Sequence, residues 1–284
     1  MTDSHGTTPR EAFARVVRAL EPYAHDVVMI GGWVHALLLS KAGDRTSPVY
    51  TDDIDVSVPR KLLATGRPTL IELATGAGFK IDPLSELEDS PIRLTIKGKH
   101  GTLIDLDILT ESPTPREAIL IEGQPGLAAQ GYPGQAFLLN HTQWVEVGPE
   151  IHRLLDPPML VRIPTIGAYS VHKGLSFATR TNGSKAAKDL VYLFEILRHS
   201  TLGRLARTEV RELATESPQI IDEWCQNLSS ALLRGDLLRE MADQLSLVGQ
   251  VTGPTLDVIG RVKGEFRRTL DEIQAKLSNR RPPS

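Results

Sequence analysis

The segments Val27-Val28-Met29-Ile30-Gly31-Gly32-Trp33 and Thr51-Asp52-Asp53-Ile54-Asp55-Val56 decide the fold. The first joins an apolar run to a glycine pair and a helical stretch, which predicts a strand that turns into a helix. The second predicts a strand with Asp53 and Asp55 on one face, because strand side chains alternate. Two carboxylates held side by side repel each other unless a cation lies between them. The pair therefore indicates a divalent metal close to a phosphate.

A second pair of acids lies on a later hairpin. Residues 92–97 and 103–109 alternate apolar and polar side chains on either side of a turn. This alternation places Asp105 and Asp107 on one face. Acids that converge from neighbouring strands raise each other's pKa, so such a cluster is costly without divalent cations. Aspartates at strand ends also cap turns. Taken alone, Asp53 and Asp55 could therefore have a structural role instead of binding a metal.

The rest of the chain predicts an α+β half followed by a helical half. We expect a catalytic domain over residues 1–160, with a small mixed sheet flanked by helices, and a helical domain over residues 161–284 that completes the cleft. The boundary is indicated by the prolines at 157 and 158. Besides the strands above, a further strand is expected at 143–147. The expected helices are 9–24, 33–40, 67–75, 165–180, 184–199, 206–215, 218–246 with breaks, and 254–278.

Composition indicates a cytoplasmic protein with no membrane partner. The 284 residues are 40% hydrophobic and 24% charged, as in globular proteins. The net charge of −3 is no global signature of nucleic-acid binding, so a polyanion would need a local basic patch. The single cysteine, Cys225, suits a reducing compartment. No apolar run approaches the roughly 20 residues of a membrane span, and the N-terminus lacks the pattern of a signal peptide.

Residues 27–58, extended by the acidic strand 103–109, resemble the DNA polymerase β-like nucleotidyltransferase superfamily. Its signature is a glycine pair, or Gly-Ser, followed by an Asp-x-Asp strand. The stretch is similar to antibiotic nucleotidyltransferases and to the AbiEii/MenT-type nucleotidyltransferase toxins of toxin–antitoxin systems. The resemblance implies a Mg²⁺-dependent enzyme that binds an NTP such as ATP. Such an enzyme transfers the nucleoside monophosphate to an acceptor hydroxyl and releases pyrophosphate.

The same resemblance implies roles for the glycines and the acids. Gly31 and Gly32 would let backbone N–H groups approach the triphosphate at a helix N-terminus. Asp53 and Asp55 would bind two Mg²⁺ ions. The third carboxylate, which would hold the metal nearer the attacking hydroxyl, is Asp105 or Asp107. The residues do not choose between these two, so all four acids are candidate catalytic and metal-binding residues.

A second pattern lies in residues 164–197. In the AbiEii/MenT-type toxins a helix lysine is followed by an arginine, a short loop and a basic-Asp pair, and Lys173, Arg180, Lys188 and Asp189 resemble that arrangement. Lys188 stands where arginine is frequent. The resemblance implies that Lys173 contacts a triphosphate oxygen and that Asp189 orients it across the helix hairpin. A surface pair between Asp189 and Lys185, four residues earlier, is the simpler alternative.

Other polar residues have weaker signals. Thr51 opens the acidic strand on the face of Asp53, where its hydroxyl could contact a phosphate. Arg93, Thr95 and Lys97 alternate on one face of the hairpin, where they either line the cleft or form the solvated side of an edge strand. His172 is expected to be a packing or solvent residue rather than a ligand.

Three functions are compatible with these patterns. The first is a toxin that modifies RNA at a tRNA 3′ end, with a cognate antitoxin as a further partner. Its RNA surface would come from basic residues in 173–188 and 262–281. The second is an aminoglycoside- or lincosamide-type nucleotidyltransferase, whose cationic drug would want an acidic cleft to which residues 86–89 could contribute. The third is a silent module that only binds a partner, against which the intact acids argue.

Overall fold

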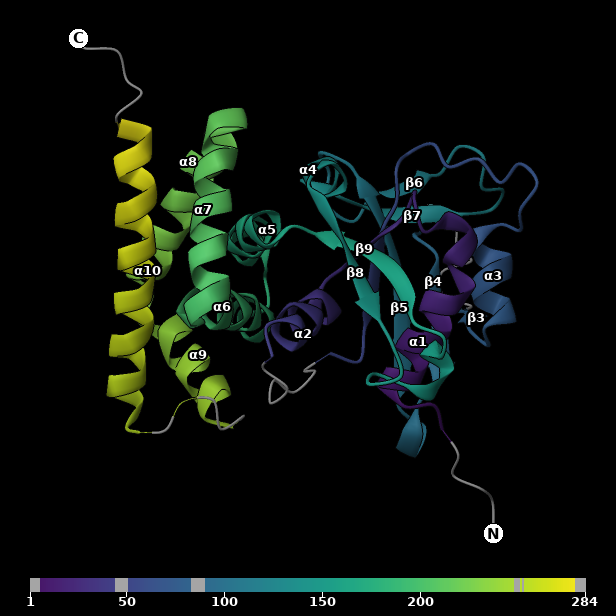
Figure 1. Ribbon diagram of the computed structural model, residues 1–284, viewed down its shortest axis with the longest axis horizontal. Coiled ribbons are helices and arrows are strands. Elements are labelled where there is room, and N and C mark those ends of the chain that lie inside the picture. The colour runs from purple at the N-terminus through teal and green to yellow at the C-terminus, as the bar shows by residue number, and fades with distance from the viewer. Residues whose placement is uncertain (1–5, 44–50, 83–89, 248–250, 252, 279–284) are drawn as a thin grey trace. The chain divides into compact units, whose positions relative to one another are not determined.

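The computed structural model describes residues 6–43, 51–82, 90–247, 251 and 253–278. A mixed sheet with helices over residues 9–164 is followed by a helical region, which confirms the predicted α+β class (Figure 1). The chain forms two compact units. The first unit comprises Met1–Leu37 and Val49–Pro164, and the second comprises Leu38–Pro48 and Thr165–Ser284. The expected boundary at 160/161 lies inside the last strand of the first unit.

In the described residues, seven strands form one sheet in the order β1-β2-β5-β4-β3, with β7 against the end of β5 and β6 against β7. Strands β8 and β9 form a separate antiparallel ribbon, and β9 packs beside β1. The strands are β1 (Val28–Ile30), β2 (Ile54–Ser57), β3 (Lys80–Ile81), β4 (Arg93–Lys97), β5 (Leu103–Glu111), β6 (Ala118–Leu120), β7 (Ala128–Tyr132), β8 (Thr142–Val147) and β9 (Met159–Pro164).

The core side of the sheet carries the apolar half of each alternating strand. Ile54 and Val56 of β2 are buried, as are Leu94 and Ile96 of β4 and the apolar residues at even-numbered positions of β5. Figure 1 shows α1 and α3 side by side on this side of the sheet. The polar residues at odd-numbered positions of β5 therefore lie on the opposite face.

The helices that precede α5 are α1 (Pro9–Ala19), α2 (Gly32–Lys41), α3 (Leu70–Gly76) and α4 (Gln135–Asn140). The expected helix 9–24 ends at Ala19, and a 3₁₀ turn, Glu21–Tyr23, takes its place. The expected helix 67–75 starts only at Leu70. The reason is a capping box, in which the Thr69 hydroxyl accepts from Glu72 N and the Glu72 carboxylate accepts from Thr69 N.

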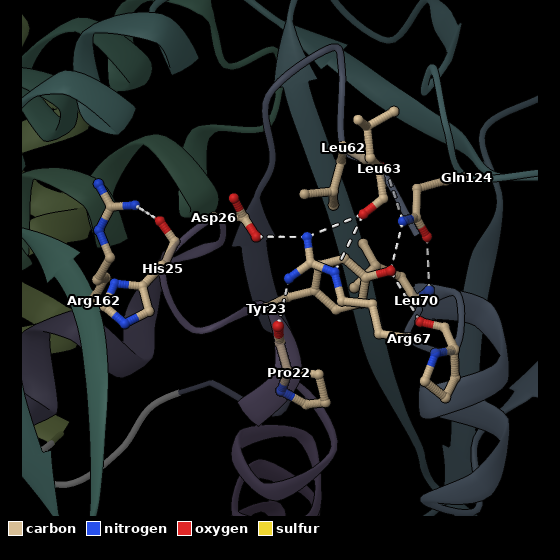
Figure 2. Close-up of polar contacts among 11 residues, drawn as sticks. Pro22, Tyr23, His25, Asp26, Leu62, Leu63, Arg67, Leu70, Gln124 and Arg162 are labelled. Atoms are coloured by element: carbon tan, nitrogen blue, oxygen red, sulfur yellow. Dashed lines mark hydrogen bonds and ion pairs between the residues drawn. The ribbon is translucent and has the colours of Figure 1, made fainter. Parts of the chain in front are cut away.

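Figure 2 shows how the segment before β1 is fixed. The Arg67 guanidinium lies 3.6 Å from the centre of the Tyr23 ring and pairs with Asp26 at 2.8 Å. The buried Gln124 amide donates to the Tyr23 hydroxyl at 2.8 Å and accepts from Leu70 N at 2.8 Å. These contacts connect the chain that leads into β1 to the connection between β2 and α3. They hold the chain just before β1, the strand that leads into the glycine pair, against that connection.

The helical region is built from six helices in the described residues. They are α5 (Ile166–Thr179), α6 (Gly183–Arg198), α7 (Ser200–Glu216), α8 (Pro218–Ala231), α9 (Gly235–Leu247) and α10 (Thr255–Ser278). The helix expected at 206–215 starts six residues earlier, because the His199 ring accepts from the N–H groups of Thr201 and Leu202. No helix in the described part of the chain is long and apolar enough to cross a membrane.

Candidate functional site

The acidic face of the sheet is formed by β2 and β5, which run parallel. Their register places Asp55 directly opposite Asp107. Asp53 and Asp105 lie two residues earlier along the chain than these acids, at the same end. All four side chains are partly buried, whereas the intervening apolar residues are fully buried. The structure therefore brings the four predicted acids to one face, which we call the acidic face.

The electrostatics of the acidic face centre on Asp107. Burial, followed by the negative charges of Asp55, Asp105 and Asp53, raises the pKa of Asp107 to about 7, and Arg93 opposes the shift. The structure also bears on the choice that the sequence left open. Asp107 lies opposite Asp55, whereas Asp105 lies 3.9 Å from Arg93 Nε. The register therefore places Asp107, rather than Asp105, directly beside Asp55.

Gly31 lies directly against the acidic face. The backbone at Gly31 has φ +73°, and a Cβ atom there would be 1.9 Å from Asp55 Oδ2. Ile30, the preceding residue, pairs with Asp55 across β1 and β2. Any side chain at position 31 would occupy the place of the carboxylate, so this glycine is required by a close approach as well as by its φ. Helix α2 begins at Gly32, and its N-terminus therefore starts beside an acid.

Thr51 differs from its expected role. Its side chain is buried, with an exposed fraction of 5%. Its hydroxyl donates to Asp53 O at 3.2 Å and accepts from Asp53 N at 3.3 Å. The hydroxyl therefore shapes the turn that leads into β2 rather than offering an exposed phosphate contact.

The acidic face has the donor chemistry of a magnesium site. Mg²⁺ takes carboxylate oxygens and keeps several of its waters, so it needs only a few protein ligands. In the residues that the structure describes, no three His, Cys, Asp or Glu side chains are drawn together into a ready metal-binding group. Carboxylates without a cation between them repel each other, so their oxygens would have to turn toward a common point on binding.

Two buried polar side chains near the acidic face escaped the sequence interpretation. Ser57 follows Asp55 by two residues on β2, and its fully buried hydroxyl has no partner among the described residues. Gln135 is also fully buried with both amide atoms unpartnered. It opens α4, which packs on β2 and β5 and whose N-terminus is capped by the Glu111 carboxylate. The alternation could have revealed Ser57, but no local signal marks Gln135.

A second polar cluster lies within the helical region. Lys173 Nζ donates to Asp189 Oδ1 at 2.7 Å, and both side chains are buried. The other carboxylate oxygen accepts from Ser176 Oγ and from Arg180 Nε, both at 3.1 Å. The predicted pairing of Lys173 with Asp189 is confirmed. The alternative, a surface pair with Lys185, is wrong because Asp189 is only 3% exposed.

Charge explains the ionisation of this cluster. Burial opposes the ionisation of Asp189, but the charges of Lys173 and Arg180 outweigh it and lower its pKa to about 2. Burial and the neighbouring Lys173 lower the pKa of His172 to about 3, so His172 is neutral near pH 7. Its Nε2 is buried without a partner among the described residues, which fits the expected packing residue. Lys173 is enclosed, whereas the Arg180 side chain is 33% exposed.

The two clusters belong to different units. The acids and the glycine pair lie in the first unit, and Lys173, Arg180 and Asp189 lie in the second. The expected acidic segment 86–89 and the basic residues Arg280 and Arg281 lie outside the described residues. No protein-family model matches this chain, and no curated protein matches it. Function is therefore inferred from the residues themselves.

The raised pKa of Asp107 predicts a pH dependence of stability. The folded state holds this proton more tightly than the unfolded state, so the free energy of unfolding falls as pH rises from about 4 to about 7. Without divalent cations, Asp107→Asn should therefore raise the free energy of unfolding by up to roughly 4 kcal/mol at pH 8 and change it little at pH 4. Urea unfolding in EDTA measures both values. Equal stability of the two proteins at pH 8 would contradict the assignment.

Proposed function

We propose that this chain is a Mg²⁺-dependent nucleotidyltransferase. The observation that carries the proposal is the register of Asp55 opposite Asp107, with Gly31 in contact with the Asp55 carboxylate. This places a glycine-led helix N-terminus, the element that commonly receives phosphates, beside a set of carboxylates suited to Mg²⁺. A structural role alone would not account for four acids on one face, since each raises the cost of ionising the others.

The residues divide the reaction between them. Backbone N–H groups at Gly31 and Gly32 would bind the triphosphate of an NTP. Asp53, Asp55 and Asp107 would hold two Mg²⁺ ions, which when bound activate the attacking oxygen and stabilise the leaving one. The acceptor hydroxyl forms a bond to the α-phosphorus, and the bond to the bridging oxygen breaks, which releases pyrophosphate. Asp107 is the carboxylate placed to accept the hydroxyl proton.

The acceptor and the setting are proposed from the resemblance. We infer that the acceptor is RNA, with a tRNA 3′ end as the first choice, and that the chain acts in the cytoplasm as the toxin of a toxin–antitoxin pair. The resemblance also gives Lys173 a role in NTP binding. Its buried pairing with Asp189 means that Lys173 would have to exchange partners in order to touch a phosphate. Arg180 is the more exposed cation of that cluster.

A transfer assay tests this proposal. The full chain is incubated with Mg²⁺, one α-³²P-labelled NTP at a time, and either total tRNA or a panel of aminoglycosides and lincosamides. We expect label on RNA. Label on a drug alone would support the proposed reaction but identify the chain as an antibiotic nucleotidyltransferase instead of a toxin. Absence of label with every NTP and acceptor would contradict the nucleotidyltransferase and leave the silent binding module.

A further inference from the structure

A row of basic side chains lies next to the acids on the same face of the sheet. Strand β4 is antiparallel to β5, with Arg93 opposite Asp107 and Thr95 opposite Asp105. Strand β3 continues the row, because Lys80 pairs with Thr95. Directly paired residues share a face, so these side chains all lie on the acidic face. β4 is flanked by β5 and β3, which overturns the alternative of an edge strand.

We call Lys80, Arg93 and Lys97 the basic strip. All three side chains are exposed, and the Arg93 side chain is 56% exposed. Arg93 Nε lies 3.9 Å from Asp105 Oδ2, so an acid accompanies this end of the strip. Among the described residues, Lys80 and Lys97 make no ion pair. No carboxylate of the described residues pairs with the positive charge of these two lysines.

The strip lies on the opposite side of the acids from the glycine turn. Across the sheet, Gly31 lies against Asp55 of β2. The next strand, β5, carries Asp107, and the strip follows on β4 and β3. Arg93 and Lys97 are four residues apart, which on a strand is about 13 Å. A triphosphate bound at the glycine turn would leave the strip free for a second polyanion.

We propose that the basic strip binds the phosphodiester backbone of single-stranded RNA and thereby delivers a 3′ hydroxyl to the acidic face. The identity of the acceptor rests on the proposed function, whereas the polyanion site rests on the register and the charges of β3 and β4. A net charge of −3 requires that RNA binding use a local patch of this kind. The same lysines would repel a cationic aminoglycoside, so the strip favours RNA over the drug as acceptor.

The test uses the full chain and a 12-nucleotide single-stranded RNA with a 5′ fluorescein label. Fluorescence anisotropy with Mg²⁺ and without NTP gives the affinity at several KCl concentrations. The double variant Lys80→Gln, Lys97→Gln should weaken binding about tenfold at low salt, equally for several RNA sequences. The slope of log affinity against log salt should become shallower by about 1.4, because two phosphate contacts are lost. The matched control Lys61→Gln removes an exposed lysine outside β3 and β4 and should change neither value.

The outcomes separate the strip from the proposed reaction. RNA affinity and salt slope equal to wild type in the double variant, or no RNA binding by the wild type, would overturn the strip. A fall in MgATP affinity in place of RNA affinity, measured by calorimetry, would overturn it as well and assign the strip to the nucleotide. Loss of RNA binding in the double variant supports the strip, whether or not the wild type transfers label. Absence of label transfer by the wild type contradicts only the proposed reaction.

Discussion

Asp55→Asn should reduce nucleotide transfer by at least about a thousandfold, because several kcal/mol of charge stabilisation in the transition state would be lost. Asp55 lies opposite Asp107 and against Gly31, so it is the acid that connects the other carboxylates with the glycine turn. The substitution keeps the shape of the side chain and removes one of the charges that repel Asp107. We therefore expect the free energy of unfolding to stay the same or to rise in the absence of Mg²⁺. Label transfer and urea unfolding measure the two effects.

The matched control for this substitution is Asp52→Asn. Asp52 lies next to Asp53 in the sequence, but its side chain is exposed and it precedes β2 out of phase with Asp53 and Asp55. The Asp52→Asn protein should retain nucleotide transfer. An Asp55→Asn protein that is folded and still transfers at the wild-type rate would exclude the two-metal assignment. Loss of transfer together with a loss of stability would instead indicate a structural role for this carboxylate.

The second large effect concerns stability in the helical region. Asp189→Asn should lower the free energy of unfolding by about 3–5 kcal/mol, because it leaves the Lys173 ammonium buried without its carboxylate. Arg180 would add a second positive charge with the same lost partner. The double variant Lys173→Met, Asp189→Leu should be more stable than Asp189→Asn alone, since it removes both buried charges. Urea unfolding followed by circular dichroism compares the three proteins.

The same double variant separates packing from function. A restored fold without transfer would support the proposed role of Lys173 in NTP use, and transfer at the wild-type rate would exclude it. A loss of less than 1 kcal/mol in Asp189→Asn would show that the pair is not held as described. The control Lys185→Gln changes the exposed lysine at the i−4 position, and neither stability nor transfer should respond.

The acids could be found from the sequence because alternation along a strand is a local property. Asp53 and Asp55 share one face of their own strand, and Asp105 and Asp107 share one face of theirs, whatever the rest of the sheet does. The pairing of Lys173 with Asp189 was also predictable, since consecutive helices joined by a short loop place such residues side by side.

Strand order could not be predicted in this way, because it depends on contacts between distant residues. The parallel pairing of β2 with β5, which sets Asp107 opposite Asp55, has no local signal. The position of β4 between β5 and β3 has none either. The burial of Thr51 and the start of α7 depend on side-chain hydrogen bonds to backbone groups, which composition and periodicity do not reveal.

The parallel pairing of β2 and β5 also governs when the acidic face can exist. Asp55 and Asp107 are about fifty residues apart along the chain, and β2 has no neighbour carrying acids until β5 has been made. Pairings over such distances form slowly, because the loop must close before the contact stabilises it. A growing polypeptide on the ribosome therefore carries the glycine pair and the first two acids well before they have a third. The acidic face would therefore form in a single step, when β5, the central strand of the sheet, is added.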